Sequence, residues 1–434
     1  AGGTQSSGTN SVALGYANAS GNTSLAAATG TYQSSYGSIA ANSLSLGSYN
    51  KSSGYQAGAF GGFGNISSGN SSFATGYQSQ ATGDRAFASG YTTTASGSAS
   101  FAHGDNVSAT GARSFCQGGG SATASGEGSV AMGYAAVSSN ENAFALGRNT
   151  DATHSKSYAI GYGAQATANS AMAIGEAATA TAQDALALGT NTQVLGQGSV
   201  AIGIGDASYG VLSGADHSLA IGRQARVRAN CDYSIAIGYS SDVNNGQSAA
   251  MGYNASAFGV GSLGVGLDAY AGNDYALALG KGSYAGNAYS SAVGANSSTQ
   301  GSTTAANGAM ALGGSYASGT DSFAAAIATN ASSYGAKNQY SIAMGRNSKA
   351  SGDYATGIGY NVTASGSVSI AMGDRAQATG SGSICLAAGG TGWGASATGA
   401  SSVTIGDGAI ARGRGKFSFA SGNTAVGSSM MQSG

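Results

Sequence analysis

The chain of 434 residues contains no proline, and only 8% of its residues are charged. Proline has no backbone N–H to give to a β-ladder, so its absence is typical of a chain that is almost entirely in strands. Collagen needs proline as well as glycine, and is excluded although 76 residues are glycine. The formal net charge of −1 provides no basic field, so no nucleic-acid partner is expected.

Residue types that carry out catalysis are also scarce. There are three cysteines without metal-ligand spacing, and His103, His154 and His217 lie far apart and at different phases of the repeat described below. No nucleophile–base pair and no phosphate-binding loop is visible. We therefore expect no enzyme, no catalytic residue, no metal and no cofactor. No apolar run is long enough for a membrane span.

What the chain does have is a five-residue phrase of a small residue, an apolar residue, Ala, an aliphatic residue and Gly. It stands at 129–133 (SVAMG), 143–147 (AFALG) and 171–175 (AMAIG), and its closing glycines recur every 14 residues. A fixed period indicates stacked identical units. We predict one continuous repeat domain over residues 1–434, with about 28 rungs. Longer intervals predict insertions near 204–218, 295–309 and 389–402.

One rung is numbered here from position 1, the first residue of the phrase, to position 14. Glycine occupies position 5 and often position 12, as at Gly76 and Gly83, which predicts two turns and two short strands per rung. Strand alternation puts the large residues at positions 2 and 4 on one face and the alanine at position 3 on the other. We expect the large side chains to fill a flat coil. Four phenylalanines 14 residues apart should stack inside it: Phe73, Phe87, Phe101 and Phe115.

The face of small residues is then expected to contact neighbouring chains, since a solenoid alone needs one buried face. Cysteine replaces the alanine in two rungs, where a small buried thiol is the simplest interpretation. The predicted interface residues are Ala131, Ala145, Ala159, Ala173, Ala187, Ala201, Ala236, Ala250, Cys116 and Cys385.

The phrase resembles the head repeat of trimeric autotransporter adhesins, the YadA-like head repeat, at 199–203 (SVAIG), 234–238 (SIAIG) and 341–345 (SIAMG). The resemblance implies an all-β, left-handed parallel β-roll, assembled as a homotrimeric fibre and exposed on a cell surface. It also implies that positions 2 and 4 fill each roll and that position 3 faces the trimer interior. The repeat is similar to segments of bacteriophage and viral fibres as well, so a virion surface stays open as the location.

Three features are candidates for surface binding. Position 6 is tyrosine in many rungs, including Tyr77, Tyr91, Tyr134, Tyr162, Tyr239 and Tyr253. These tyrosines either form a platform for sugars or protein, or only cover the turn. Three arginines share one rung, at Arg223, Arg226 and Arg228, and either bind an acidic glycan or are solvated. Trp393 is either an exposed contact or fills a wide rung.

The function favoured by these observations is a non-enzymatic, extracellular fibrous adhesin that attaches by multivalent contacts. Its partners would be a host-surface glycan or a matrix or surface protein. One alternative is the shaft of a phage or viral tail fibre. A second alternative is a structural spacer without a ligand.

Overall fold

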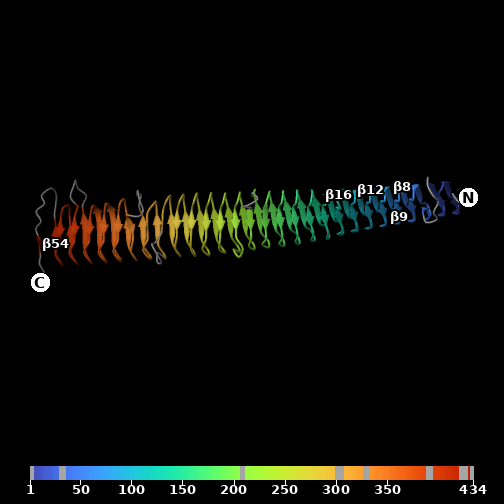
Figure 1. Cartoon of the computed structure of the whole chain (residues 1–434). Helices are drawn as coiled ribbons and strands as arrows, with labels where there is room; N and C mark the ends of the chain where they lie inside the picture. The colour runs from blue at the N-terminus through green and yellow to red at the C-terminus, as the bar shows by residue number, and fades with distance from the viewer. Residues whose placement is uncertain are drawn as a thin grey trace. The chain divides into compact units, whose positions relative to one another are not determined.

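The computed structural model describes residues 4–28, 36–205, 211–298, 307–325, 333–387, 394–419 and 429–430. Within these ranges the secondary structure consists of strands and turns, with no helix. The chain divides into two compact units, Ala1–Ser213 and Gly214–Gly434. In each unit, successive rungs lie side by side, with blue to green colours in the first unit and green to red in the second (Figure 1).

In the first unit, each rung contributes two strands. The first strand lies in the five-residue phrase, and the second strand lies in the second half of the repeat. The first strands are β2 (Val12–Gly15), β4 (Leu25–Ala28), β6 (Leu44–Ser48), β8 (Gly58–Phe63), β10 (Phe73–Tyr77), β12 (Phe87–Tyr91), β14 (Phe101–Asp105), β16 (Phe115–Gly119), β18 (Val130–Tyr134), β20 (Phe144–Leu146), β22 (Tyr158–Ile160), β24 (Met172–Ile174), β26 (Leu186–Leu188) and β28 (Val200–Ile202). The second strands are β1 (Gln5–Ser6), β3 (Asn18–Ala19), β5 (Gly37–Ser38), β7 (Lys51–Ser52), β9 (Ile66–Ser67), β11 (Gln80–Ala81), β13 (Thr94–Ala95), β15 (Ser108–Ala109), β17 (Thr123–Ala124), β19 (Val137–Ser138), β21 (Asp151–Ala152), β23 (Gln165–Ala166), β25 (Thr179–Ala180), β27 (Thr192–Val194) and β29 (Val211–Ser213).

The second unit repeats this arrangement. Its first strands are β30 (Leu219–Ile221), β32 (Ile235–Ile237), β34 (Ala249–Met251), β36 (Leu263–Val265), β38 (Leu277–Leu279), β40 (Ser291–Val293), β41 (Met310–Leu312), β42 (Phe323–Ala325), β44 (Ile342–Met344), β46 (Thr356–Tyr360), β48 (Ile370–Asp374), β50 (Ile384–Ala387), β52 (Val403–Ile405) and β54 (Phe417–Phe419). Its second strands are β31 (Arg226–Val227), β33 (Asp242–Val243), β35 (Ser256–Ala257), β37 (Tyr270–Ala271), β39 (Tyr284–Ala285), β43 (Gly335–Ala336), β45 (Lys349–Ala350), β47 (Thr363–Ala364), β49 (Gln377–Ala378), β51 (Ser396–Ala397) and β53 (Ile410–Ala411). The short β55 (Ser429–Met430) pairs antiparallel with β54.

The repeat period sets the register. First strands pair in parallel with first strands of the next rung, and second strands with second strands. In the second unit the ladder of second strands is divided between β39 and β43, where only isolated bridges continue it. Between β18 and β20, Val130 lies beside Phe144 and Ala131 beside Ala145. Equivalent positions therefore stack on one another, as the 14-residue spacing predicts. The prediction of an all-β solenoid with two short strands per rung is confirmed. The prediction of one continuous domain stays a prediction.

The two turns of each rung use left-handed backbone. In the first turn, position 5 is glycine with φ of +135° at Gly133, and position 7 is left-handed at Ala135 (φ 53°). In the second turn, the left-handed residue is at position 14, for example Asn142 (φ 54°). Only glycine, and to a lesser extent asparagine, adopts this region at little cost. The sequence therefore places the turn glycine at position 5 correctly.

The glycine at position 12 has a different role from the one predicted. Gly83 does not have positive φ, and a Cβ added to it would lie 2.1 Å from the carbonyl oxygen of Gly97 in the next rung. Position 12 is therefore glycine because stacked backbones approach closely there. The buried serine at position 1 completes this corner, since the Ser114 hydroxyl donates to the Gly111 carbonyl at 2.7 Å. A buried hydroxyl without such a bond would destabilise the coil.

The three predicted insertions fall partly outside the described residues, which omit 206–210, 299–306 and 388–393. In the described part nearby, the ladder of first strands continues from β40 to β41. On the opposite side, isolated bridges at Ser298, Tyr316 and Ala317 stand in place of second strands.

Candidate functional site

The interior of the coil is filled by small side chains. All ten residues predicted at the chain–chain interface are fully buried within this single chain, with 0% of each exposed: Ala131, Ala145, Ala159, Ala173, Ala187, Ala201, Ala236, Ala250, Cys116 and Cys385. The prediction that position 3 faces neighbouring chains is therefore wrong. These side chains point from the first sheet towards the second, together with buried residues of the second strands such as Ala164 and Ala166.

The physical reason is the narrow gap between the two sheets. Glycine replaces the position-3 alanine in β36, and a Cβ added to Gly264 would lie 2.5 Å from the carbonyl oxygen of Ser256 on the second strand. In β50, the Cys385 Sγ atom lies 3.1 Å from the carbonyl oxygen of Ala395. A methyl or thiol group fills this space, and a leucine or phenylalanine has no room in it.

The large side chains at positions 2 and 4 consequently point outward from the first sheet. In β26, Leu186 and Leu188 flank the buried Ala187, and 38% of Leu188 is exposed. We call this outward surface the apolar face; it consists of positions 2 and 4 of the first strands in each unit. Its more exposed members are Val12, Leu14, Leu146, Tyr158 and Leu188 in the first unit, and Ile235, Leu279, Met310, Ile342, Met344, Met372, Leu386, Ile405, Phe417 and Phe419 in the second.

The phenylalanine ladder lies on this same face. Phe73, Phe87, Phe101 and Phe115 stack with ring centroids 5.4, 5.0 and 4.8 Å apart and interplanar angles of 7° or less. The predicted stacking is confirmed. Its predicted place inside the coil is wrong, because all four rings are half-buried at position 2 and point outward.

The tyrosines at position 6 form exposed rows at the first turn. Tyr77 stacks on Tyr91 at 5.0 Å, and Tyr239 on Tyr253 at 4.9 Å, with interplanar angles of 7° and 9°. All four rings are exposed, as are Tyr134 and Tyr162. The rings are therefore exposed and stacked, as a surface platform requires, and the binding role stays a prediction.

In some rungs arginine replaces tyrosine at position 6 and contacts the tyrosine rings of the neighbouring rungs. The Arg148 guanidinium lies between Tyr134 and Tyr162, 5.5 and 5.8 Å from the two ring centroids. Arg223 lies 5.8 Å from the Tyr239 centroid. Such cation–π contacts extend the row by one rung, so a position-6 arginine substitutes for a tyrosine in a continuous stack.

The three arginines of one rung are not gathered at one place. Arg223 belongs to the first turn, whereas Arg226 and Arg228 are at the second strand and just after it. Arg228 makes a bidentate ion pair with Asp242, with Nε–Oδ1 and Nη2–Oδ2 distances of 3.0 and 2.5 Å. Asp242 hydrogen-bonds this guanidinium and raises the pKa of Arg228. The acidic-glycan role stays a prediction, and the charge of Arg228 is already compensated within the chain. Trp393 lies outside the described residues.

The second turn carries tyrosines that the sequence reasoning missed. We call Tyr233, Tyr275, Tyr289, Tyr340 and Tyr354 the second-turn tyrosines; each occupies position 14 in the second unit and has left-handed φ between 55° and 59°. Tyr275 stacks on Tyr289 at 5.2 Å, Tyr340 on Tyr354 at 4.8 Å, and His217 on Tyr233 at 5.2 Å. The 14-residue spacing of Tyr275 and Tyr289 is the signal that could have revealed them.

Chemically reactive groups are sparse and shielded. Burial raises the pKa of the Cys116 and Cys385 thiols from 9.0 to about 11, and it also raises the pKa of Cys231. In the part of the chain that the structure describes, no group of three His, Cys, Asp or Glu residues could hold a metal ion. Nor does a helix long and apolar enough to cross a membrane occur among those residues.

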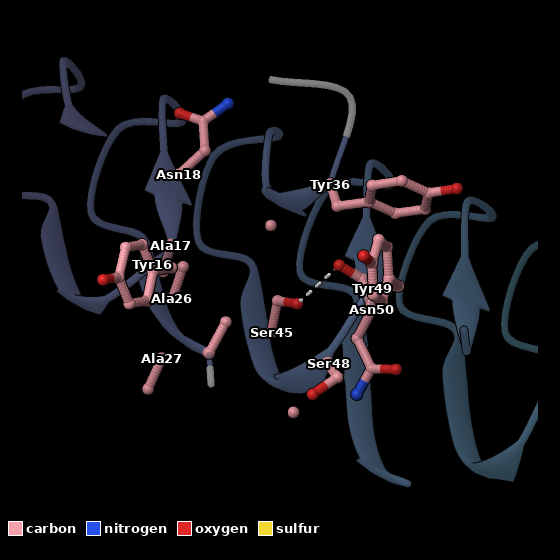
Figure 2. Close-up of a pocket in the computed structure, with 13 residues that line it drawn as sticks. Tyr16, Ala17, Asn18, Ala26, Ala27, Tyr36, Ser45, Ser48, Tyr49 and Asn50 are labelled. Carbon is pink, nitrogen blue, oxygen red and sulfur yellow. Dashed lines mark hydrogen bonds between the residues drawn. The ribbon is translucent and has the colours of Figure 1, made fainter. Parts of the chain in front are cut away.

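A small cavity lies near the start of the first unit, with Tyr16, Tyr36 and Tyr49 in its lining (Figure 2). Its volume is about 20 Å³, which is room for roughly one water molecule. In Figure 2 the Ser45 hydroxyl donates to the Asn50 carbonyl oxygen at 3.1 Å across the inside of one rung. This cavity is too small for a ligand, and the surfaces considered below are the apolar face and the two turn edges.

A comparison with family models matches the chain to the YadA head domain repeat, in a model of two repeat copies. The matched residues are 2–18, 67–93, 124–150, 155–178, 180–205, 214–241, 336–361 and 364–384. A comparison with curated proteins found no match. The matches occur in both units and follow the phase of the rungs described above. The chain therefore contains YadA head domain repeats in both of its units.

Proposed function

We propose that three copies of this chain assemble through their apolar faces into an extracellular adhesive fibre of left-handed rolls. The observation that carries the proposal is the apolar face itself. Large Leu, Ile, Met and Phe side chains point away from the coil in rung after rung of each unit, and they are half-buried or exposed in the single chain. Monomeric soluble proteins rarely expose continuous apolar surface of this extent.

The amount of apolar surface is sufficient for a stable interface. A half-exposed Leu, Ile or Met side chain leaves roughly 40 Å² of apolar surface in water, which is roughly 80 Å² per rung. About ten rungs would then supply the ~800 Å² per partner that a stable protein interface uses. The repeat continues through both units, so an assembly of copies in register has more than enough surface.

The family supports a partner of the same sequence. YadA-like head domains are a family of surface-exposed trimeric adhesins, and the face of one copy matches that of another because equivalent positions recur every rung. In a trimer the apolar face would be covered, whereas both turn edges would remain exposed. Contacts at these edges would repeat along three chains, so weak individual contacts would add up to firm attachment.

The assembly is tested by measuring the mass of the particle in solution for two double variants, each of which adds two glutamates. We expect Ile202→Glu with Ile237→Glu, at position 4 of the apolar face, to convert the trimer to monomer. The control is Gln165→Glu with Gln193→Glu, which adds the same charge on the outer side of the second sheet. A trimer that survives the first variant, or a wild-type chain that is monomeric, refutes the proposed assembly.

The adhesive role is tested separately. The trimer should bind saturably to arrays of cell-surface glycans and matrix proteins, and should carry coated particles to cells. A structural spacer would show no saturable binding in either assay. A tail-fibre shaft would be found on virions, so imaging of the native particle distinguishes the remaining alternative.

A further inference from the structure

The five second-turn tyrosines and His217 form three stacked pairs on one edge of the second unit. His217 and Tyr233, Tyr275 and Tyr289, and Tyr340 and Tyr354 each occupy adjacent rungs and stack at centroid distances of 4.8 to 5.2 Å. Two rungs without an aromatic residue at position 14 separate successive pairs, with Gln247 and Gly261 in the first gap and Gly308 and Asp321 in the second. The pairs therefore recur every four rungs, about 19 Å at a strand spacing of ~4.8 Å.

The turn does not require these aromatic residues. Position 14 is left-handed in every described rung, and residues as different as Arg85, Ala99 and Asn142 fill it in the first unit. Asparagine and glycine adopt this conformation at lower cost than tyrosine does. Five tyrosines nevertheless occupy it in the second unit, and 45% to 64% of each is exposed. Since neither the backbone nor the interior of the coil explains them, a role at the surface does.

The surroundings of the rings indicate the chemistry of the ligand. Aspartates lie next to the aromatic positions at Asp216, Asp232, Asp274 and Asp353, and Asp321 stands between two pairs. One oxygen of Asp274 accepts a hydrogen bond from the Val260 backbone N–H at 2.8 Å, which fixes the carboxylate beside the Tyr275 ring. Among the described residues at positions 12 to 14 of this stretch, from 215 to 354, there is no lysine or arginine.

We propose that this edge binds an extended, uncharged glycan. Tyrosine rings offer a rigid apolar face for the C–H face of a sugar and a hydroxyl for hydrogen bonding. The neighbouring carboxylates accept hydrogen bonds from sugar hydroxyls. The same carboxylates repel acidic glycans and nucleic acids, because no lysine or arginine occupies positions 12 to 14 of this stretch. A linear chain of sugars can contact several pairs at once, which a compact ligand cannot do across about 19 Å.

This inference names the ligand class for the proposed adhesive function and rests on that function. It assigns binding to the second turn of the second unit, whereas the sequence predicted it at the first turn. It does not depend on the trimer, since all the residues concerned belong to one chain.

The test uses the full chain and a panel of soluble oligosaccharides measured by calorimetry. The uncharged probes are hexamers of β-linked glucose, N-acetylglucosamine and mannose, and the acidic probe is a heparin oligosaccharide. We expect the wild type to bind at least one uncharged hexamer and not heparin. Tyr275→Asn with Tyr289→Asn should weaken that binding about tenfold. Replacing all five second-turn tyrosines by asparagine should abolish it.

Asparagine is chosen because it favours left-handed backbone, so these variants should keep the fold. The matched control is Arg85→Asn with Ala99→Asn, which changes the same turn position in the first unit. The proposal is overturned by absence of binding to every uncharged hexamer, by preference for heparin, or by full affinity in the five-tyrosine variant. If cell attachment persists in that variant, the adhesive function stands and only the glycan site falls. If wild-type attachment itself is absent, the proposed function fails as well.

Discussion

Replacing Ala201 by glutamate distinguishes the observed interior from the interface that the sequence predicted. The Ala201 side chain is fully buried between the two sheets. A glutamate there places a carboxylate between the two sheets, and it adds four heavy atoms to a gap that holds a methyl group. Overpacking costs about 1–3 kcal/mol, and burial of an unpaired charge costs several kcal/mol more.

The summed cost approaches the 5–15 kcal/mol that stabilises a typical domain. Because each rung contacts mainly its neighbours, we expect the damage to be concentrated around β28 and the rungs beside it. Far-ultraviolet circular dichroism should show a lower melting temperature, and hydrogen exchange should show lost protection in residues near 186–202. Ile202→Glu, one residue away on the apolar face, should weaken the contact between chains but keep the hydrogen-exchange protection of the coil around β28.

The opposite pattern would refute the reasoning. If Ala201→Glu gave a monomer with wild-type melting temperature and protection, the alanine would lie between chains and the sheets would face the other way. Equal loss of fold in both variants would also contradict the account, because it assigns only one of the two positions to the interior.

Three further predictions follow from the described contacts. First, Cys116 and Cys385 should react very slowly with thiol reagents at pH 8, because burial raises their pKa to about 11, and all three cysteines should react at once in denaturant. The folded pKa exceeds the unfolded one, so the stability due to the neutral thiols is complete below about pH 9 and falls as pH rises towards 11; a denaturation series over this range that showed rising stability would contradict the assignment. Second, Arg228→Ala should lower the free energy of unfolding by about 0.5–1 kcal/mol, since the Asp242 partner is only 19% exposed, whereas Arg113→Ala should change it by less than about 0.5 kcal/mol because its pair with Glu127 is 69% and 54% exposed. If urea denaturation gave the same change in unfolding free energy for Arg228→Ala and Arg113→Ala, solvent exposure would not determine the strength of these ion pairs. Third, Gly83→Ala should be strongly destabilising, because the new Cβ would lie 2.1 Å from a carbonyl oxygen, whereas Gly163→Ala meets nothing within 4 Å and should cost only about 1 kcal/mol of left-handed strain. A melting temperature lowered more by Gly163→Ala than by Gly83→Ala would be incompatible with this geometry.

The repeat could be read from the sequence because it is a local property. The 14-residue interval, the turn glycine at position 5 and the stacking of Phe73 on Phe87 follow from spacing alone, and the structure confirms them. Parallel pairing of equivalent positions follows in turn, because a fixed period brings identical residues side by side.

The orientation of the strands could not be read in the same way. Alternation separates Leu188 from Ala187 but does not say which of them points inward. The usual expectation that large apolar residues fill the core is wrong here, because the gap between the sheets is set by backbone contacts such as the one at Gly264. The small residues at Ala164 and Ala166 of the second strand were the available signal, since an interior lined by methyl groups on one side needs small residues on the other.

The most direct test of the account is a density map of the purified native assembly at side-chain resolution. We expect three chains, with Leu188 and Ile202 at the contacts between them and Ala187 and Ala201 enclosed within each chain. A particle of one chain, or a map in which the alanines meet across the contact and the large side chains fill the coil, would contradict the account.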